Sequence, residues 1–542
     1  MISNVLAQSV QSVSDKFHWL DWMVVVGYMI LTTLIGHKMS GNQSSIKDFF
    51  LGGRKLPWWA VSGSMIATEV SALTFIGVPG IVFALEGDWG YLQWGIGSII
   101  ARFAVAYWLI PMYYEKEIYS PYDFMGNRLG NSIKRVVTFL FSLGAVLGQS
   151  VRVVVTAVIL QVVTGLPPWT CIAIIGLVAV LWTYMGGMQT VIWTDVMQFG
   201  LFIIGGLLAF GLLVYHLGWG QIVDLNQIQV AGESINKMRI LDFTAPFQDP
   251  TLRYTMWVAL LAMPFQNFTA FGVDQLNTQR MFCCGSLKEA RKAMCWSSVS
   301  ILITVLMLAV GSGLFAWYKV NVPPADIAAS FASNTDFVFP TWITMELPVG
   351  LSGLILAGAF AAAISSLDSI LAALSQTSLS AIYGREKLEE EGQGKRMVMI
   401  SRIAVCAWGI ILTAAALVMW QIYESDPKAD LIGLAFGMVA YTYGPLLGIL
   451  LAAIIPMRFN TFGLIAGTIV SILMVAWFRN EVIVIIELLG KYIEALDVDT
   501  ITQKIKVSRP KLASEWFFPI NALLTLLVGM AFGGFKKEKN KE

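Results

Sequence analysis

The chain has 542 residues, of which 56% are apolar and only 13% are charged, and its mean hydropathy is +0.68. Soluble domains carry about 25% charged residues, so these proportions argue against a cytosolic enzyme and against a disordered chain. The 36 basic and 35 acidic residues leave a formal net charge of +1, which argues against a nucleic-acid partner because no basic excess remains. The composition favours an all-α polytopic membrane protein, since the apolar runs are long rather than alternating as in a β-barrel.

Membrane-spanning segments can be placed by length. A helix that crosses the hydrocarbon core, about 30 Å thick, needs about 20 mostly apolar residues. About thirteen segments meet this condition, and the sequence predicts neither an appended soluble domain nor a cleavable signal. The segments lie near residues 20–37, 57–83, 90–113, 136–163, 168–185, 190–216, 251–273, 296–318, 348–383, 397–421, 430–456, 461–478 and 515–535.

The basic residues predict the orientation of these spans, because positive charge marks cytoplasmic loops. If the amino terminus lies outside, the inward loops carry pairs such as Lys134 and Arg135, and the basic tail after residue 535 is inward as well. The outward loop 479–514 is an exception, but late and long loops are weak topology signals. We therefore predict a multi-pass protein of the cell membrane with an outside amino terminus and a cytoplasmic carboxyl terminus.

Several classes of chemistry have no sequence signal. No Walker-type GxxxxGK[ST] element is present, so ATP is not expected to be bound or to supply energy. The five cysteines show neither a pairing pattern nor metal-ligand spacing, and the three histidines lie near predicted span ends. We expect no organic cofactor, no nucleotide partner and no enzymatic activity, and we expect a monomer in the lipid bilayer.

The second span, 57–83, is polar in its middle. It contains Glu69 among hydroxyl residues, and a carboxylate at the bilayer centre costs roughly 2.5–3.5 kcal/mol, so it normally faces a cavity or a partner. Gly77, Pro79 and Gly80 follow and favour a broken helix, whose freed carbonyls are tolerated only where they coordinate an ion or line a cavity. The alternative is a kinked packing helix whose hydroxyls bond to its own carbonyls.

Two further spans carry carboxylates. In the ninth span Ser365, Asp368 and Ser369 fall on neighbouring strips of one helix face, and a buried Asp368 needs a cation, a proton or an arginine. Asp195 lies near the start of the sixth span, at a depth that Asp368 could share. The alternative is that Asp195 only caps its helix.

Two arginines lie deep within predicted spans. Arg152, deep in the fourth span, either pairs with Glu69 or binds an anionic solute with two parallel hydrogen bonds. Arg102, in the third span, has no assigned partner.

Four segments together resemble the sodium:solute symporter family, which includes sodium–sugar, sodium–proline and sodium–sialic acid cotransporters. They are the stretch from Ala67 to Pro79, the run Tyr184-Met-Gly-Gly-Met-Gln-Thr-Val-Ile-Trp-Thr-Asp195-Val-Met-Gln198, the run Asp274-Gln-Leu-Asn-Thr-Gln-Arg280 and the run Ala361-Ala-Ala-Ile-Ser-Ser-Leu-Asp-Ser369. The match extends from about residue 20 to 456, and the order and spacing of the four segments carry it.

The resemblance implies a leucine-transporter-type core, in which two inverted five-helix repeats enclose a site at the membrane midplane. The repeats are expected at about 57–216 and 251–456, within a unit 1–456 that also holds the first helix. Residues 457–542 are expected to form accessory helices and a short cytoplasmic tail. The span 251–273 carries a polar interruption in the place that corresponds to the broken second span, and two such helices point to the binding site.

The resemblance also implies ion-binding residues. The sodium site that the family shares falls on the backbone carbonyls of Ala67, Val70 and Ala362 and the hydroxyls of Ser365 and Ser366. A second sodium site, found in some members, falls on Asp195, Ser365, Asp368 and Ser369. Asp368 stands where the sialic acid carriers have a serine, and its charge either strengthens the site or is neutralised by a proton.

The solute site follows in the same way. Arg152 stands where the sialic acid transporters grip the substrate carboxylate, and Glu69 stands where sugar carriers have an amide that contacts the substrate. Ser71, Thr74 and Asn267 also fall on solute-facing positions. Phe268 and Phe271 are candidates for a gate over the bound solute, with ordinary helix packing as the alternative.

The function that we predict is sodium-coupled symport, which imports a sugar or a carboxylated sugar such as sialic acid by alternating access. The main alternative is a proton-coupled or sodium-coupled carrier of amino acids or organic anions with the same architecture. In a proton-coupled carrier Asp195 and Asp368 would bind protons. A channel is a further alternative, which requires a continuous polar pore.

Overall fold

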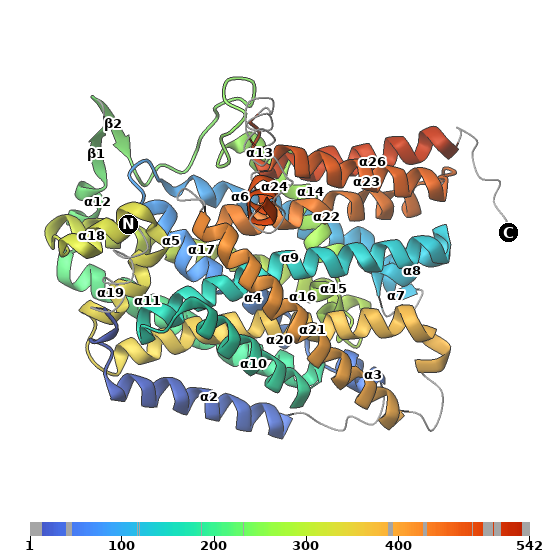
Figure 1. Ribbon diagram of the computed structural model, residues 1–542, viewed down its shortest axis with the longest axis horizontal. Coiled ribbons are helices and arrows are strands. Elements are labelled where there is room, and N and C mark those ends of the chain that lie inside the picture. Colours follow the sequence, from blue (N-terminus) through green and yellow to red (C-terminus); the bar gives the residue numbers. More distant parts are fainter. Residues whose placement is uncertain are drawn as a thin grey trace.

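A computed structural model describes residues 13–39, 46–115, 118, 120–185, 187–230, 232–388, 394–425, 431–479, 481–490, 502 and 511–533. Most of these residues are helical, and the long helices lie side by side in one bundle (Figure 1). The helices in chain order are α2 (Trp19–Met39), α3 (Ile46–Leu51), η1 (Gly52–Arg54), α4 (Trp58–Glu69), α5 (Ala72–Phe83), η2 (Trp89–Gln93), α6 (Trp94–Ala104), η3 (Val105–Leu109), α7 (Ile110–Glu115), α8 (Pro121–Leu129), α9 (Asn131–Thr164), α10 (Pro168–Met185), α11 (Met188–Leu217), α12 (Trp219–Leu225), α13 (Met256–Leu261), α14 (Met263–Gly272), α15 (Gln275–Met281), α16 (Leu287–Trp296), η4 (Ser297–Val299), α17 (Ser300–Val320), α18 (Ala325–Ser333), η5 (Thr335–Phe337), α19 (Val338–Glu346), α20 (Leu351–Leu388), α21 (Gly394–Ser425), α22 (Leu431–Ile454), α23 (Thr461–Phe478), α24 (Glu481–Gly490), η6 (Ser514–Trp516) and α26 (Phe517–Gly533).

Within the described residues, ten helices are long and apolar enough to cross a membrane, and α4 with α5 forms an eleventh, bent span. Each of the thirteen predicted segments contains helix, but the number of thirteen spans is not confirmed. The apolar part of α10 is shorter, and the predicted span 251–273 is divided into the short helices α13 and α14. The chain is a helical, multi-pass membrane protein.

The centre of the bundle is formed by α20 and α9. Of the apolar window in each helix, 94% is buried in α20 and 78% in α9, against 22% in α2, which lies along the lower edge of Figure 1. Helix α20 contacts α2, α4, α9, α10, α11 and α21. Its Ala- and Ser-rich sequence allows this close packing, because small side chains let helix backbones approach one another.

Both predicted helix interruptions are present. The second span bends by 52° between α4 and α5, where Val70 has φ −81° and ψ 79°. The other interruption lies at Ala262 (φ −111°, ψ −48°), between α13 and α14 and just before the polar run 264–272. The first break is stabilised locally, because the Ser71 hydroxyl accepts the Leu73 amide at the start of α5.

One end of the bundle carries the strands β1 (Gln227–Val230) and β2 (Glu233–Asn236), an antiparallel hairpin in which Gln227 faces Asn236. The segment 237–255 then returns to α13 (Figure 1). Lys237, fully buried at its start, donates to the carbonyls of Ala84, Leu85 and Gly87 at 2.5, 3.2 and 2.9 Å. The hairpin is therefore attached to the end of α5.

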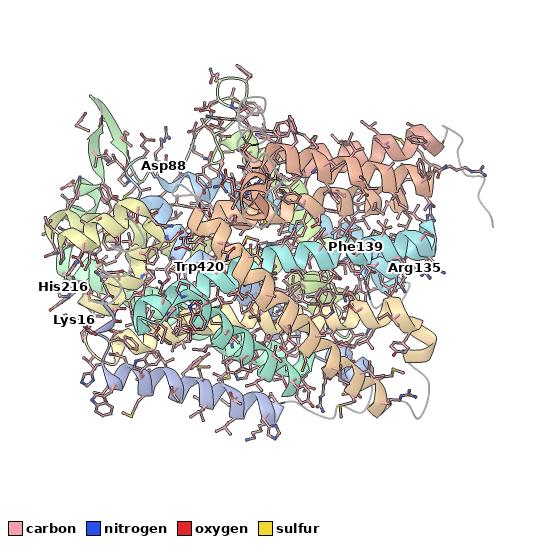
Figure 2. All side chains as sticks on the ribbon, in the orientation of Figure 1. Lys16, Asp88, Arg135, Phe139, His216 and Trp420 are labelled. Atoms are coloured by element: carbon pink, nitrogen blue, oxygen red, sulfur yellow. The ribbon has the colours of Figure 1, made fainter. Side chains whose placement is uncertain are left out.

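Charged side chains gather at the two ends of the bundle. Lys16, Asp88 and His216 lie toward one end in Figure 2, and Arg135 lies at the other. Between the ends, large apolar side chains such as Phe139, which is 65% exposed, cover the outside of the helices. This is the distribution that a bilayer requires. The predicted direction of insertion stays a prediction.

Candidate functional site

The break between α4 and α5 frees two backbone carbonyls. The Ser71 amide donates to the Glu69 carbonyl at 3.0 Å, and the Thr74 amide donates to the Ser71 carbonyl at 2.9 Å. In an unbroken helix these two amides would bond to the carbonyls of Ala67 and Val70. The break thus releases the two oxygens that the predicted sodium site takes from this helix.

Helix α20 brings hydroxyl groups to the same place. The Ser366 hydroxyl donates to the Thr68 carbonyl at 3.3 Å, next to the break. The neighbouring Ser365 hydroxyl donates to the Asp195 carboxylate. Ala362 precedes Ser366 by one turn of the same helix. The residues predicted for the shared sodium site therefore come from two helices in contact, α4 and α20.

Asp195 is part of a buried ion pair that the sequence did not predict. Arg280 donates to the Asp195 carboxylate at 3.1 Å, and both side chains are fully buried. The Arg280 guanidinium also donates to Ser64 at 2.8 Å, to the Leu276 carbonyl at 2.6 Å and to the Ser369 hydroxyl. Helix α11 begins at Met188, so Asp195 does not cap it, and the capping alternative is wrong.

Asp368 borders a space between α2, α10 and α11. Its carboxylate accepts the Ser369 hydroxyl at 3.1 Å and is only 3% exposed. It lines a small hollow beside α2 together with Thr32, Thr33, Gly36, His37, Trp182, Thr190, Val191 and Thr194. Of the four residues predicted for a second sodium site, the structure joins Asp195, Ser365 and Ser369 through hydrogen bonds, whereas Asp368 bonds only to Ser369 within that set.

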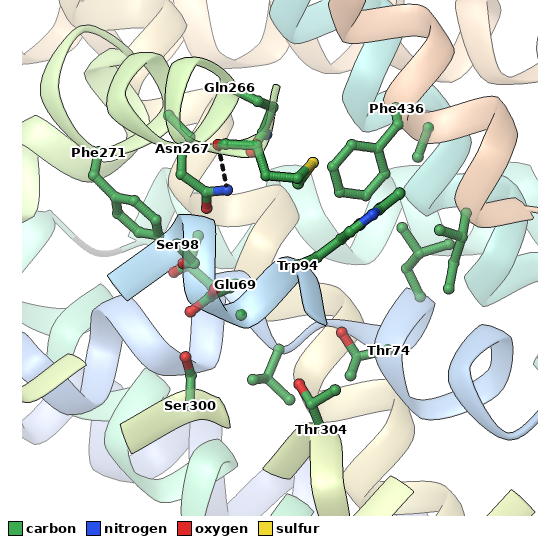
Figure 3. A pocket seen from close by; sticks show the side chains of 18 of the residues that line it. Glu69, Thr74, Trp94, Ser98, Gln266, Asn267, Phe271, Ser300, Thr304 and Phe436 are labelled. Carbon is green, nitrogen blue, oxygen red and sulfur yellow. Dashed lines mark hydrogen bonds between the residues drawn. The ribbon is translucent and has the colours of Figure 1, made fainter. Parts of the chain in front are cut away.

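A cavity of about 190 Å³ lies beside the helix break (Figure 3). The predicted residues that line it are Glu69, Val70, Thr74, Arg152, Asn267 and Phe271. The structure does not bring Ser71 and Phe268 to its wall. Ser71 caps α5, and the Phe268 ring packs 5.9 Å from the ring of Trp108.

Arg102 is the partner of Glu69. The two form an ion pair, and the guanidinium carbon of the fully buried Arg102 lies 4.0 Å from the centre of the Phe271 ring. The other donors of Arg102 reach the hydroxyls of Ser98 at 3.2 Å, Ser297 at 2.6 Å and Ser300 at 3.3 Å. Glu69, whose side chain is 30% exposed, is thus neutralised on one side and open to the cavity on the other.

Arg152 has a different environment. One of its terminal nitrogens donates to the Thr68 carbonyl at 2.9 Å, and within the described residues no carboxylate forms a salt bridge with it. The alternative in which Arg152 pairs with Glu69 is therefore wrong. Arg152 lines the cavity with a guanidinium that keeps further donors for a ligand.

The Asp274–Arg280 run connects the site to its surroundings. Asp274 caps α15 and accepts the hydroxyl of Tyr443, a cavity residue, at 2.6 Å. Gln275 donates to Gln376 of α20 at 3.0 Å, and Gln279 donates to the Phe50 carbonyl at 2.9 Å. These contacts make the run a structural support rather than a set of ligands.

Several polar residues of the cavity wall were not predicted from the sequence. They are Gln149, Gln266, Ser300, Thr304 and Tyr443. Helical spacing could have found Gln149, which lies one turn before Arg152 on the same helix face. Asn267 donates to the Met263 carbonyl at 2.9 Å, and its amide oxygen points toward Ser98 and Glu69 (Figure 3).

The comparison with known proteins identifies the family. The model of the sodium:solute symporter family matches residues 49–471. The chain belongs to the sodium:solute symporter family. This family is one of transporters, as the four sequence segments indicated.

Similar proteins agree with this assignment. This symporter is 28% identical over 461 residues to the sodium/sialic acid symporter SiaT of Proteus mirabilis, covering 85% of this chain and 89% of that protein. It is 28% identical over 485 residues to the sodium/glucose cotransporter of Vibrio parahaemolyticus, covering 85% of each. A solved structure of a substrate-bound, outward-open Na+-coupled sialic acid symporter superimposes with a TM-score of 0.77 at 25% identity, covering 97% of this chain and 100% of the other.

Proposed function

We propose that this symporter couples sodium to the import of an anionic solute that carries hydroxyl groups, such as a sugar acid. The observation that carries the proposal is the guanidinium of Arg152, which lines the cavity and bonds to the Thr68 carbonyl. A guanidinium binds a carboxylate with two parallel hydrogen bonds. Because Arg102 already neutralises Glu69, Arg152 gives the cavity a net positive charge that attracts an anion.

The polar wall supports a hydroxylated solute. Amide and hydroxyl groups of Gln266, Asn267, Ser300 and Thr304 surround the cavity, and aromatic rings such as Trp94 and Phe436 complete it (Figure 3). The Gln149 amide lines it as well. Such a mixture of a few polar groups with apolar surfaces is typical of small-molecule sites. The names of relatives that carry sialic acid or glucose point to the same class of solute.

The coupling ion is proposed to bind at the helix break. The ligands are the carbonyls of Ala67, Val70 and Ala362 and the hydroxyls of Ser365 and Ser366. Two of these carbonyls lack their helical amides, and the serines lie on the helix that contacts the break. Uncharged oxygen ligands suit a hard monovalent cation. Sodium at this position joins α4 to α20 and fixes the break that borders the solute cavity.

We propose a second sodium site in the same set of residues, centred on Asp368 rather than on Asp195. Arg280 already supplies positive charge to Asp195 and donates to Ser369. Asp368 is the other carboxylate of the set Asp195, Ser365, Asp368 and Ser369, and within the described residues it forms no salt bridge and accepts a hydrogen bond only from Ser369. A second coupled cation is therefore expected at Asp368, and a proton at this residue is the alternative.

Transport is proposed to follow alternating access between two inverted repeats, at about 57–216 and 251–456. The two interrupted helices, α4–α5 and α13–α14, support this arrangement. Sodium and solute each raise the affinity for the other by the same factor. Each net charge carried inward gains about 2.3 kcal/mol per 100 mV, which corresponds to about 50-fold accumulation. We propose that the transporting unit is a monomer.

The test uses the purified full-length protein in liposomes. We expect sialic acid or another sugar acid to accumulate when an inward sodium gradient is imposed, and we expect no accumulation with potassium or choline. A panel that also contains glucose and neutral amino acids identifies the solute class. Equal uptake in choline would contradict sodium coupling, and a preference for neutral sugars would contradict the role of Arg152.

A further inference from the structure

The segment 237–255 lies against the outer wall of the cavity. Trp94, which lines the cavity, donates its indole N–H to the Arg253 carbonyl at 2.9 Å. Its ring centre lies 5.1 Å from that of Tyr254 and 4.8 Å from that of Phe436. We call Trp94, Tyr254 and Phe436 the aromatic wall. Gln93 adds a bond from its amide to the Tyr254 carbonyl at 2.9 Å.

The carboxyl-terminal helices support this segment from behind. Arg253 donates to the Glu515 carboxylate, just before α26, from two nitrogens at 3.1 and 3.0 Å. The Glu515 side chain is fully buried, and that of Arg253 is 18% exposed. The Arg253 guanidinium carbon also lies 5.6 Å from the Trp94 ring centre and 5.4 Å from that of Tyr254. The same side chain thus contacts both the aromatic wall and the accessory helix.

We infer that Arg253 and Glu515 are positioning residues that hold the aromatic wall against the solute, so that a helix outside the predicted repeats sets solute affinity. The inference rests on the proposed function for the identity of the cargo. A backbone bond between the Ala513 amide and the Pro250 carbonyl, at 2.8 Å, strengthens the same connection.

The energetics favour a fixed contact. Breaking a buried ion pair by removing one partner costs about 3–5 kcal/mol, because the other charge stays buried without compensation. Arg253 and Glu515 therefore remain together in any state in which Glu515 is buried. Arg239 in the same segment is a natural contrast, since its side chain is 57% exposed, pairs with Asp88 and Asp242, and within the described residues forms no hydrogen bond or ion pair with the aromatic wall.

The experiment compares sodium-driven uptake by the wild type, the double variant R253M/E515Q and the control R239M in liposomes. The double variant removes both charges and so avoids a buried, unpaired carboxylate. We expect its half-saturating solute concentration to rise at least fivefold, while the maximal rate and the half-saturating sodium concentration stay within twofold. R239M should match the wild type. An unchanged solute dependence in the double variant, or an equal shift in R239M, overturns the inference.

A second measurement does not depend on the solute. Thr304 lines the cavity, so Thr304→Cys reports its accessibility after Cys295 and Cys406, the partly exposed native cysteines, are replaced by serine. We expect a hydrophilic maleimide to label this cysteine at least threefold faster when R253M/E515Q is added. Unchanged labelling overturns the inference. If the wild type transports no solute with sodium, the proposed function fails while this labelling result still decides the positioning role.

Discussion

At the scale of single residues, the two arginines deep in the predicted third and fourth spans have different partners. Arg102 meets Glu69 and three serines, whereas Arg152 meets a backbone carbonyl and the cavity. The sequence predicts that both are buried and that each needs a partner. It cannot assign the partners, because Arg102 and Ser297 are 195 positions apart and meet only through the packing of α6 against η4.

The first prediction concerns Arg152→Lys. Lysine keeps the charge but loses the two parallel donors, so we expect solute binding to weaken at least tenfold and sodium binding to change less than twofold. Isothermal titration of the purified protein with solute and with sodium measures both. The control Arg102→Lys should lower the melting temperature instead, since it disrupts the contacts of Glu69. Equal loss of sodium and solute affinity in Arg152→Lys would contradict a solute-binding role.

The second prediction concerns Lys237, which lies outside the spans. Burial lowers the pKa of Lys237 from 10.5 to about 8; the charge of Lys319 lowers it further, and the charge of Asp88 offsets only part of this. Between these pH values the unfolded chain still holds the proton that the folded chain has released. Stability should therefore rise with pH in this window because of Lys237.

The measurement is the melting temperature from pH 7 to pH 10. We expect the melting temperature of the wild type to rise relative to that of Lys237→Met above about pH 8, the pKa of Lys237 in the folded state. Lys288, exposed near the start of α16, provides the control variant Lys288→Met, which should follow the wild-type profile. A difference that does not vary with pH would refute the effect of burial.

At the scale of helices, the sequence predicted the site best where local chemistry determines the backbone. Glycine, proline and mid-span hydroxyls indicated the α4–α5 break, and the structure has it at Val70. The partner of Asp195 escaped sequence analysis, because Arg280 is 85 positions away and is brought close only by α15 packing between α4 and α20. Local breaks are thus predictable, whereas pairing across the bundle is not.

The third prediction concerns the contact between α4 and α20. The double variant Ser365→Ala with Ser366→Ala removes two proposed sodium ligands, so the sodium concentration for half-maximal uptake should rise at least tenfold. Ser380→Ala, on the same helix but away from the break, serves as the control. Sodium-dependent uptake by correctly inserted protein measures the effect, and an unchanged sodium dependence would show that the ion binds elsewhere.

At the scale of the whole molecule, composition and the many apolar runs of about 20 residues predicted a helical bundle in a membrane, because runs of this length are typical of membrane-spanning helices. The number of spans was less predictable. The 251–273 segment is apolar enough to be counted as one span, but its predicted interruption divides it into helices of 6 and 10 residues, and neither is long enough to cross a membrane by itself. The repeats and the boundary near 456 stay predictions.

The fourth prediction concerns the direction of insertion. Val322, 83% exposed between α17 and α18, belongs to a loop predicted to be outside, and Ser132, exposed at the start of α9, belongs to one predicted to be inside. A membrane-impermeant maleimide applied to intact cells should therefore label Val322→Cys and spare Ser132→Cys until the cells are opened. The reverse pattern would invert the topology.

The hydrogen bond from Ser365 to Asp195 has a consequence for ion capture. Because the carboxylate takes the hydroxyl hydrogen, the lone pairs of that oxygen stay turned away from Asp195 and available before any ion arrives. The guanidinium of Arg280 holds the carboxylate in place in turn. If sodium binds at the proposed site, part of the reorganisation that an ion normally imposes on its ligands is already complete in the folded protein, and the proposed oxygen cage is preorganised for its entry.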